Sequence, residues 1–279
     1  MVYSVSTASL SDIEIIAEVG INHNGSLDLA KRHVEAAAKS GATTVKFQTY
    51  ITSERVSSSH PLSQVLKDSE LTLEEFEALE STCKDWGVRF LSTAFGLSSL
   101  QMLLDLDQQR CKIASFSLVD EALIRAAVRA DMSLVISTGA SSLDEISQTN
   151  TWLPEEDPTH IFLHCISEYP VNSESALNLI NIPVIRELTS RHVGFSDHSL
   201  GSEGFLFATL AGARVFEKHF TADRTLPGPD QAMSANQELF SECVANIQRG
   251  LEILGNPRLT PFDAELGILA FRTNLTSRE

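Results

Sequence analysis

The sequence lacks several features that would assign it to other classes of protein. Its 279 residues include only four cysteines, which form no Cys-x-x-Cys pair, so we expect them to be reduced and structural. Nowhere do 18 apolar residues run together, and the opening MVYSVSTASLSD has no basic segment followed by an apolar one. We therefore expect a cytoplasmic protein with no membrane span and no secretory signal.

Positive charge is also scarce. The chain has 21 lysines and arginines against 37 aspartates and glutamates, a net charge of −16 at pH 7, and no basic block. A field of that sign repels nucleic acids and anionic membranes, so neither is an expected partner. An acidic protein that binds an anionic substrate must gather its few cations locally, so lysines near the ends of strands are of most interest.

Short apolar runs rich in β-branched residues alternate with longer amphipathic stretches along the whole chain. This pattern is typical of repeated βα units around a parallel sheet. The predicted strands are Glu14–Val19, Thr44–Gln48, Val88–Thr93, Cys111–Ser115, Ser133–Thr138, His160–Cys165, His192–Ser196 and Arg214–His219. Eight strands predict an α/β protein that folds as a single (β/α)8 TIM barrel.

Helical patterns separate these strands. The predicted helices are Ser26–Ser40, Thr72–Trp86, Leu97–Asp105, Asp120–Arg129, Ser142–Thr149, Ala176–Ser190, Ser202–Ala213 and Asn236–Leu254. Thr72 with Glu75, and Ser142 with Glu145, have the spacing of a capping box. The stretch Tyr50–Ser69 is a polar loop that we expect to overhang the barrel mouth.

In such barrels the chemistry lies at the carboxyl ends of the strands. The polar residues at those ends are Glu18, Lys46, Gln48, Ser92, Thr93, Lys112, Ser115, Ser137, Thr138, His164, Ser167, Ser196, Asp197, His198, Glu217 and His219. They predict a polar ring above an apolar barrel interior.

Two histidines end the last two predicted strands. Neighbouring strands lie about 4.8 Å apart, so inward-facing rings of His198 and His219 would be close enough to bind one divalent ion. Two protein ligands leave positions open for water and a substrate oxygen. The alternative is that either histidine only satisfies a buried hydrogen bond.

Lysines and hydroxyls at the strand ends are suited to bind a phosphate and a carboxylate. The candidates are Lys46, Lys112, Ser115, Ser137 and Ser196. A single lysine at such a place can instead be a solvated charge at the rim. Lys112 and Ser115 are three apart and cannot share a face of a regular strand, so a bulge or a strand end must separate them.

Two carboxylates are candidate acid/base groups. Glu18 ends the first strand, and the alternative role for it is a buried partner for a lysine. Asp230 lies in the loop Leu226-Pro-Gly-Pro-Asp230, where an aspartate can equally form a turn.

Eight motifs occur in order at βα spacing, over about residues 13 to 255. They are EIIAEVGINHNGSLDLAKRHVEAAAKSGATTVKFQTY, RFLSTAF, CKIASFSL, VISTGASSLDEI, FLHCISEYP, VGFSDHSLG, FEKHF and LPGPDQAMS. In this order they resemble the N-acetylneuraminate (sialic acid) synthase family, which includes pseudaminate, legionaminate and spore-coat polysaccharide synthases. That family condenses phosphoenolpyruvate with an N-acetylated amino-sugar aldehyde to give a nonulosonic acid and phosphate.

The resemblance implies a role for each matching residue. His198 and His219 would bind Mn²⁺, with Mg²⁺ or Co²⁺ as alternatives, and the ion would take the aldehyde oxygen. Phosphoenolpyruvate would be held by Lys46, Lys112, Ser115, Ser137 and Ser196, with Ser167 as a further contact. The sugar and the reacting carbons would be lined by Glu18, Gln48, Tyr169 and Asp230. The resemblance also implies a homodimer.

The sequence departs from the family pattern in three places. Phe116 stands where the fourth-strand motif usually has glycine, and Ala94 replaces the proline of the third-strand motif. Family members usually continue into a small antifreeze-like domain that gives an arginine to the partner subunit's sugar site. Because the chain stops at Glu279, we expect one catalytic domain over 1–279, with its core at 13–255, an extension at 256–279, and no antifreeze-like domain.

Two other functions stay open at this point. The barrel could bind a sugar acid or scaffold a partner subunit without catalysis. A site that no longer catalyses a reaction would be free to lose the histidine pair or the carboxylates, and this sequence keeps both. It could also be an unrelated metal-dependent aldolase or isomerase, which would turn over substrate without phosphoenolpyruvate.

Overall fold

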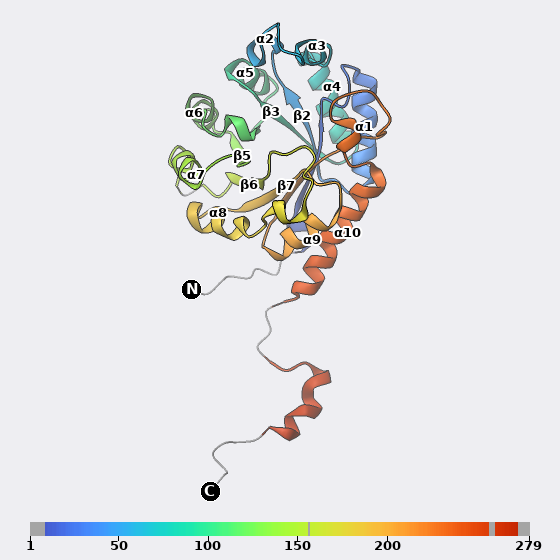
Figure 1. Ribbon diagram of the computed structural model, residues 1–279, viewed down its shortest axis with the longest axis vertical. Helices are drawn as coiled ribbons and strands as arrows, with labels where there is room; N and C mark the ends of the chain where they lie inside the picture. The colour runs from blue at the N-terminus through green and yellow to red at the C-terminus, as the bar shows by residue number, and fades with distance from the viewer. Residues whose placement is uncertain (1–8, 156, 257–259, 273–279) are drawn as a thin grey trace.

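The computed structural model describes residues 9–155, 157–256 and 260–272, and its centre is a closed barrel of eight parallel strands (Figure 1). Each strand pairs with the next in the chain, and β8 closes on β1. The strands are β1 (Glu14–Gly20), β2 (Thr44–Thr49), β3 (Arg89–Ala94), β4 (Arg110–Ile113), β5 (Ser133–Ser137), β6 (Ile161–Cys165), β7 (Val193–Asp197) and β8 (Val215–His219). The predicted (β/α)8 barrel is confirmed.

A ring of helices surrounds the strands (Figure 1). They are α1 (Leu27–Lys39), α2 (Thr52–Arg55), α3 (Ser63–Asp68), α4 (Leu73–Asp85), α5 (Leu97–Asp105), α6 (Glu121–Arg129), α7 (Leu143–Asn150), α8 (Asn181–Thr189), α9 (Glu203–Leu210) and α10 (Gln237–Leu254). Both predicted capping boxes are present, at the starts of α4 and α7. A larger apolar core lies between the barrel and these helices, and the four cysteines are buried and free.

The barrel interior is built in three levels, because alternate residues of each strand point inward. A separate apolar cluster forms the middle level, and its members are Ile16, Leu91, Val135, Leu163 and Val215. Two residues further along each strand stand Glu18, Thr93, Ser137, Cys165 and Glu217. The apolar level therefore separates the polar mouth from the floor and keeps the mouth residues on one side.

The predicted loop 50–69 contains two short helices, α2 and α3. Tyr50 and Leu66 form a small apolar cluster with Ile21 of the loop after β1. The Tyr50 hydroxyl donates to the Leu66 carbonyl oxygen at 2.9 Å. These contacts hold the segment over the mouth, as predicted.

The predicted helix Ala176–Ser190 is wrong at its start. A 3-10 turn covers Glu174–Leu177, Asn178 adopts a left-handed conformation with φ of 44°, and α8 begins only at Asn181. Pro183 explains the late start, since proline fits the first turn of a helix but would clash with the carbonyl four residues earlier in a longer one. None of the helices in the described residues is both long and apolar enough to cross a membrane.

Candidate active site

A cavity of about 730 Å³ opens at the carboxyl ends of the strands. All twelve residues singled out from the sequence line it, namely Glu18, Lys46, Gln48, Lys112, Ser115, Ser137, Ser167, Tyr169, Ser196, His198, His219 and Asp230. They come from seven strands or from the loops that follow strands. The fold therefore gathers residues up to 212 positions apart into one concave site.

A buried charge network links β1, β2, β7 and β8 at the mouth of the barrel. The Lys46 Nζ lies 2.7 Å from Oε2 of Glu18 and 3.5 Å from Oε2 of Glu217, and it donates to Thr93 Oγ1 at 3.0 Å. The Ser196 hydroxyl donates to Oε1 of Glu217 at 2.9 Å. Glu18 is therefore a buried partner for a lysine, which is the alternative role that the sequence left open. It also lines the cavity, so its carboxylate is placed to act on a bound substrate.

The second lysine, Lys112, makes no ion pair with a carboxylate in the part of the chain that the structure describes. Lys112 Nζ donates to Ser137 Oγ at 2.7 Å and to the Ile113 carbonyl oxygen at 2.9 Å. The strand β4 ends at Ile113, and the chain turns into a 3-10 helix at Ser115–Ser117. This strand end is what brings Ser115 to the same cavity as Lys112, as the spacing required.

The surroundings of these groups set their charge. Burial alone would lower the pKa of Lys46, but Glu18 and Glu217 raise it above its ordinary value. Burial lowers the pKa of Lys112, and the charge of Lys46 acts in the same direction against the opposing effect of Glu217. Burial would raise the pKa of Glu217, but Lys46, Lys112 and the Ser196 hydroxyl lower it to about 2. Glu217 is therefore ionised, and Lys112 is the lysine whose proton is held less tightly.

The two histidines lie side by side, with ring centroids 5.6 Å apart. Nδ1 of His198 lies 2.7 Å from the carbonyl oxygen of Ile166. A carbonyl only accepts, so Nδ1 carries a proton and Nε2 is the ring nitrogen left for a ligand. Nδ1 of His219 is buried, lies 4.0 Å from a carboxylate oxygen of Asp230, and has no hydrogen-bond partner among the described residues.

This pair fits a divalent ion in two respects. A histidine that binds a metal usually donates the N–H of its other ring nitrogen to a carbonyl or carboxylate oxygen, as His198 does. A buried ring nitrogen without a hydrogen-bond partner, as in His219, is rare in proteins, so a bound ion would account for it. Among the described residues, no group of three or more His, Cys, Asp or Glu side chains is arranged to hold a metal. An ion here would have two protein ligands and several open positions.

Tyr169 and Ser167 complete the wall next to the histidines. The Tyr169 ring centroid is 4.1 Å from that of His198 and 5.9 Å from that of His219. A side chain at Gly139 would overlap the Ser167 hydroxyl and approach Ser115 Oγ to 2.8 Å. The Gly139 amide donates to that Ser115 oxygen at 3.1 Å, so glycine at this place lets the loop after β5 close on both serines.

The cavity is also lined by residues that were given no role from the sequence, and three of them contact the predicted site residues. Glu217 was seen only as a strand end, Gly139 lies in the loop after β5, and Arg55 lies on α2. Arg55 NH1 donates to Oε1 of Gln48 at 3.1 Å. No local pattern marks a loop arginine as part of a site, because its place depends on how the loop packs.

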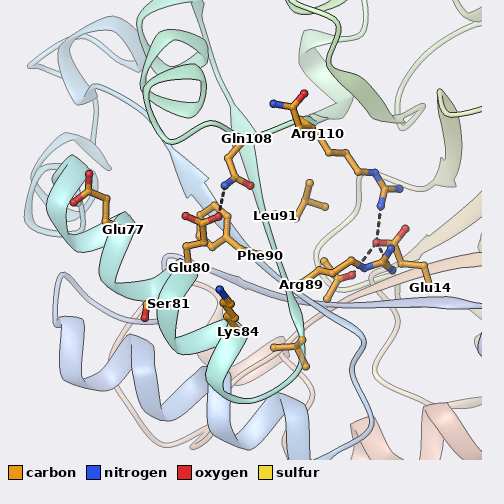
Figure 2. Close-up of a pocket in the computed structure, with 13 residues that line it drawn as sticks. Glu14, Glu77, Glu80, Ser81, Lys84, Arg89, Phe90, Leu91, Gln108 and Arg110 are labelled. Carbon is orange, nitrogen blue, oxygen red and sulfur yellow. Dashed lines mark hydrogen bonds and ion pairs between the residues drawn. The ribbon is translucent and has the colours of Figure 1, made fainter.

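A second cavity lies at the opposite end of the barrel and is lined by charged residues (Figure 2). Oε1 of Glu14 accepts hydrogen bonds from Thr44 Oγ1 at 2.8 Å and Arg110 NH1 at 2.7 Å, and Arg89 NH2 lies 3.2 Å from it. These contacts join β1 to three other strands. The cluster closes the barrel floor, where residues of this fold act mainly on stability.

A closed (β/α)8 barrel with buried lysines, carboxylates and paired imidazoles at the carboxyl ends of its strands defines a barrel enzyme. Residues 33–258 match the NeuB family. The N,N'-diacetyllegionaminic acid synthase of Legionella pneumophila is 35% identical over 95% of this chain and 80% of its own length. The pseudaminic acid synthase of Campylobacter jejuni is 31% identical over 88% of this chain and 76% of its own length.

A solved structure is similar over the whole chain. The N-acetylneuraminic acid (sialic acid) synthetase of Leptospira borgpetersenii, in complex with citrate, superimposes with a TM-score of 0.90 at 32% identity. The match covers 100% of this chain and 97% of that one. The protein belongs to the NeuB family and is a transferase-type synthase.

Proposed function

We propose that the protein condenses phosphoenolpyruvate with an N-acetylated amino-sugar aldehyde, giving a nonulosonic acid and phosphate. The observation that carries the proposal is the placement of two buried lysines, several hydroxyls and a histidine pair around one cavity. The named relatives make nonulosonic acids of this kind.

The inner part of the cavity suits an enol phosphate. Lys46 and Lys112 are both buried, with 3% and 2% of their surface exposed, so their charges are weakly screened. In the proposed complex they face the phosphate and carboxylate, and the hydroxyls of Ser115 and Ser137 donate to the remaining oxygens. Ser196 does the same once its hydroxyl turns from Glu217 to the substrate. These hydroxyls have fixed positions because each already contacts another group of the site.

The charge balance supports a divalent cation in the same cavity. The two lysines are offset by the carboxylates of Glu18 and Glu217, whereas a phosphate monoester alone carries about −1.5 to −2 at neutral pH. We assign His198 and His219 as ligands of Mn²⁺, or of Mg²⁺ or Co²⁺. When bound, the ion would supply positive charge and make the aldehyde carbon more electrophilic.

The carboxylates of the site then stabilise the charge and accept the proton that appear as the reaction proceeds. C3 of phosphoenolpyruvate forms a bond to the aldehyde carbon, and C2 becomes positively charged. The Glu18 carboxylate stabilises that charge, since its contact with Lys46 already fixes its position and it does not have to reorganise. Water adds to C2 with loss of a proton to Asp230, which passes it to the former aldehyde oxygen as that oxygen becomes a hydroxyl. The C2–O bond then breaks, so that phosphate leaves with the bridging oxygen and takes the proton of the new C2 hydroxyl as the ketone forms. Gln48, Ser167 and Tyr169 hold the sugar.

The test is phosphate release from phosphoenolpyruvate with Mn²⁺ and a panel of hexosamine aldehydes, with the product identified by mass. The proposal predicts release that depends on an aldehyde, and a product with the mass of aldehyde plus pyruvic acid. Turnover of the sugar without phosphoenolpyruvate, or binding with no release for the whole panel, would contradict it.

A further inference from the structure

A buried ion pair lies behind the two histidines of the site, on the outward face of the barrel. The Lys218 Nζ is 2.7 Å from Oδ2 of Asp197, and the two side chains are 2% and 0% exposed. A methyl group added at Gly204 of α9 would come within 3.2 Å of the same oxygen, so α9 packs on the pair. Neither partner belongs to the described lining of the mouth cavity. Any effect of the pair on a substrate must therefore pass through other residues.

The pair is also the last link between two strands. Asp197 of β7 stands opposite Lys218 of β8, and this is the final pair of their ladder in the described residues. The next residue along each strand direction is a histidine of the site, His198 and His219. The ion pair therefore joins the two strand ends at the level directly before both imidazoles.

Asp197 and Lys218 together fix the turn that carries His198. The Ser199 amide donates to Oδ1 of Asp197 at 2.8 Å, and the Lys218 Nζ donates to the Ser199 carbonyl oxygen at 2.6 Å. Both contacts reach across His198, which is the middle residue of the turn. The His198 ring itself is held by the Ile166 carbonyl oxygen. Its backbone and its ring are thus fixed by separate contacts.

The ring of His219 is held less directly. Its Nδ1 has no hydrogen-bond partner among the described residues, so the place of the ring depends on the backbone at the end of β8. That backbone pairs with β1 through the ladder, where His219 stands opposite Glu18, and Lys218 ties it to β7. Without the Lys218 contact, β8 could shift against β7, and the 5.6 Å between the two ring centroids would change.

Stability alone does not account for charges at this place. The pair stands between the barrel and the helices, in a layer whose core includes Phe195 and Phe205. Taking two charges out of water costs about as much free energy as their attraction returns, and apolar residues of similar shape often replace such pairs without loss of stability. A charged hydrogen bond does fix a distance and a direction, which an apolar contact does not.

We infer that Lys218 and Asp197 are positioning residues that set the separation of His198 and His219, and with it the affinity and geometry of the metal site. This inference rests on the proposed function, because the two histidines are assigned there as ligands of a divalent ion. Lys218 and Asp197 themselves touch neither the ion nor the substrate.

Replacing both partners separates positioning from stability. Asp197→Leu/Lys218→Met keeps the branching and length of the side chains without their charges, so the protein should unfold at no lower denaturant concentration than the wild type. Its affinity for Mn²⁺, measured by the electron paramagnetic resonance of the free ion, should fall about tenfold or more, the usual effect of losing a residue that orients a metal ligand. The visible absorption spectrum of bound Co²⁺ should change as well.

A second variant and a matched control complete the test. Asp197→Asn keeps the shape of the side chain and the Ser199 contact but removes the charge that faces Lys218. It should also weaken Mn²⁺ binding, and it serves if the double variant does not fold. Arg110→Met breaks another ion pair between strands, at the barrel floor, where Arg110 NH1 lies 2.7 Å from Glu14. It should leave the Mn²⁺ affinity within twofold, whatever its effect on stability.

The outcomes distinguish this inference from the proposed reaction. An unchanged Mn²⁺ affinity and Co²⁺ spectrum in the folded pair variants would overturn the positioning role, and so would an equal loss of affinity in Arg110→Met. Weaker Mn²⁺ binding in the pair variants would support the role even if the wild type released no phosphate with any aldehyde. That second result would overturn the reaction alone.

Discussion

The Lys46 ammonium lies 2.7 Å from a carboxylate oxygen of Glu18, and the two residues stand opposite each other on β2 and β1. Both are buried and both face the mouth. A buried ion pair by itself adds little to the free energy of unfolding, because the cost of removing both charges from water offsets much of their attraction. Its position, where one partner can bind an anion and the other can stabilise a cation, agrees with a role in the chemistry.

Replacing Glu18 by Gln is predicted to separate binding from turnover. The amide keeps the shape of the side chain and Lys46 keeps Glu217 as a counter-charge, so phosphoenolpyruvate still binds. The charge that would stabilise C2 is gone, and kcat falls by about 10² to 10³, the usual effect of losing one preorganised electrostatic contact. Calorimetry and single-turnover rates measure the two effects, and an unchanged kcat would rule out the role of Glu18.

The lowered pKa of Lys112 predicts how the binding of phosphoenolpyruvate changes with pH. Because its pKa is lowered, Lys112 loses its charge at a lower pH than an ordinary lysine, while Lys46 stays protonated. The KM for phosphoenolpyruvate should therefore begin to rise at a lower pH than the loss of charge from an ordinary lysine would set. Lys112→Met should raise that KM about 10- to 100-fold, the effect of losing a charged hydrogen bond, and remove this alkaline rise. An identical pH profile in the variant would exclude Lys112 as the titrating group.

The histidine pair predicts the metal affinity. His198→Ala and His219→Ala should each weaken Mn²⁺ binding by tenfold or more, measured by calorimetry or by the electron paramagnetic resonance of free Mn²⁺. His60→Ala is the matched control, since His60 is exposed in the loop over the mouth and does not line the cavity. Unchanged Mn²⁺ affinity in both site variants would remove the ion from the mechanism.

The backbones of β7 and β8 pack so closely at Gly194 that a larger residue there is predicted to destabilise the protein. A methyl group there would overlap the carbonyl oxygen of Val215 and come within 2.6 Å of Leu163 Cδ2. Gly194→Ala should lower the free energy of unfolding by about 3 kcal/mol, because the backbone of β8 cannot move aside. Gly96→Ala, whose new methyl group would have only Glu54 nearby at 3.8 Å, should change it by less than about 1 kcal/mol. Equal chemical denaturation curves for the two variants would contradict this packing.

The strands and the inward residues at their ends could be predicted because their signals are local. Alternation along β7 and β8 places Ser196 and His198 on one face, and the structure shows the intervening Asp197 paired with Lys218 on the other. Pro183 is also a local signal, because a proline marks the first turn of a helix. It agrees with the observed start of α8 at Asn181 and not with the predicted start at Ala176.

The outer half of the site could not be predicted, because it is made by loops. Arg55 reaches Gln48 only after Tyr50 and Leu66 pack the loop onto the barrel. Phe116 was noticed as a departure from the family pattern, yet its stacking on Phe95 depends on how the chain turns after β4. Contacts between segments far apart in sequence decide both positions.

The most direct measurement of the proposed reaction follows the bridging oxygen of phosphoenolpyruvate. The protein is incubated with Mn²⁺, a panel of hexosamine aldehydes that includes N-acetylmannosamine, and phosphoenolpyruvate labelled with ¹⁸O between C2 and phosphorus. Mass spectrometry should find the label in inorganic phosphate and an unlabelled product equal in mass to the aldehyde plus pyruvic acid. Label retained in the organic product, or phosphate released equally fast without any aldehyde, would contradict the condensation.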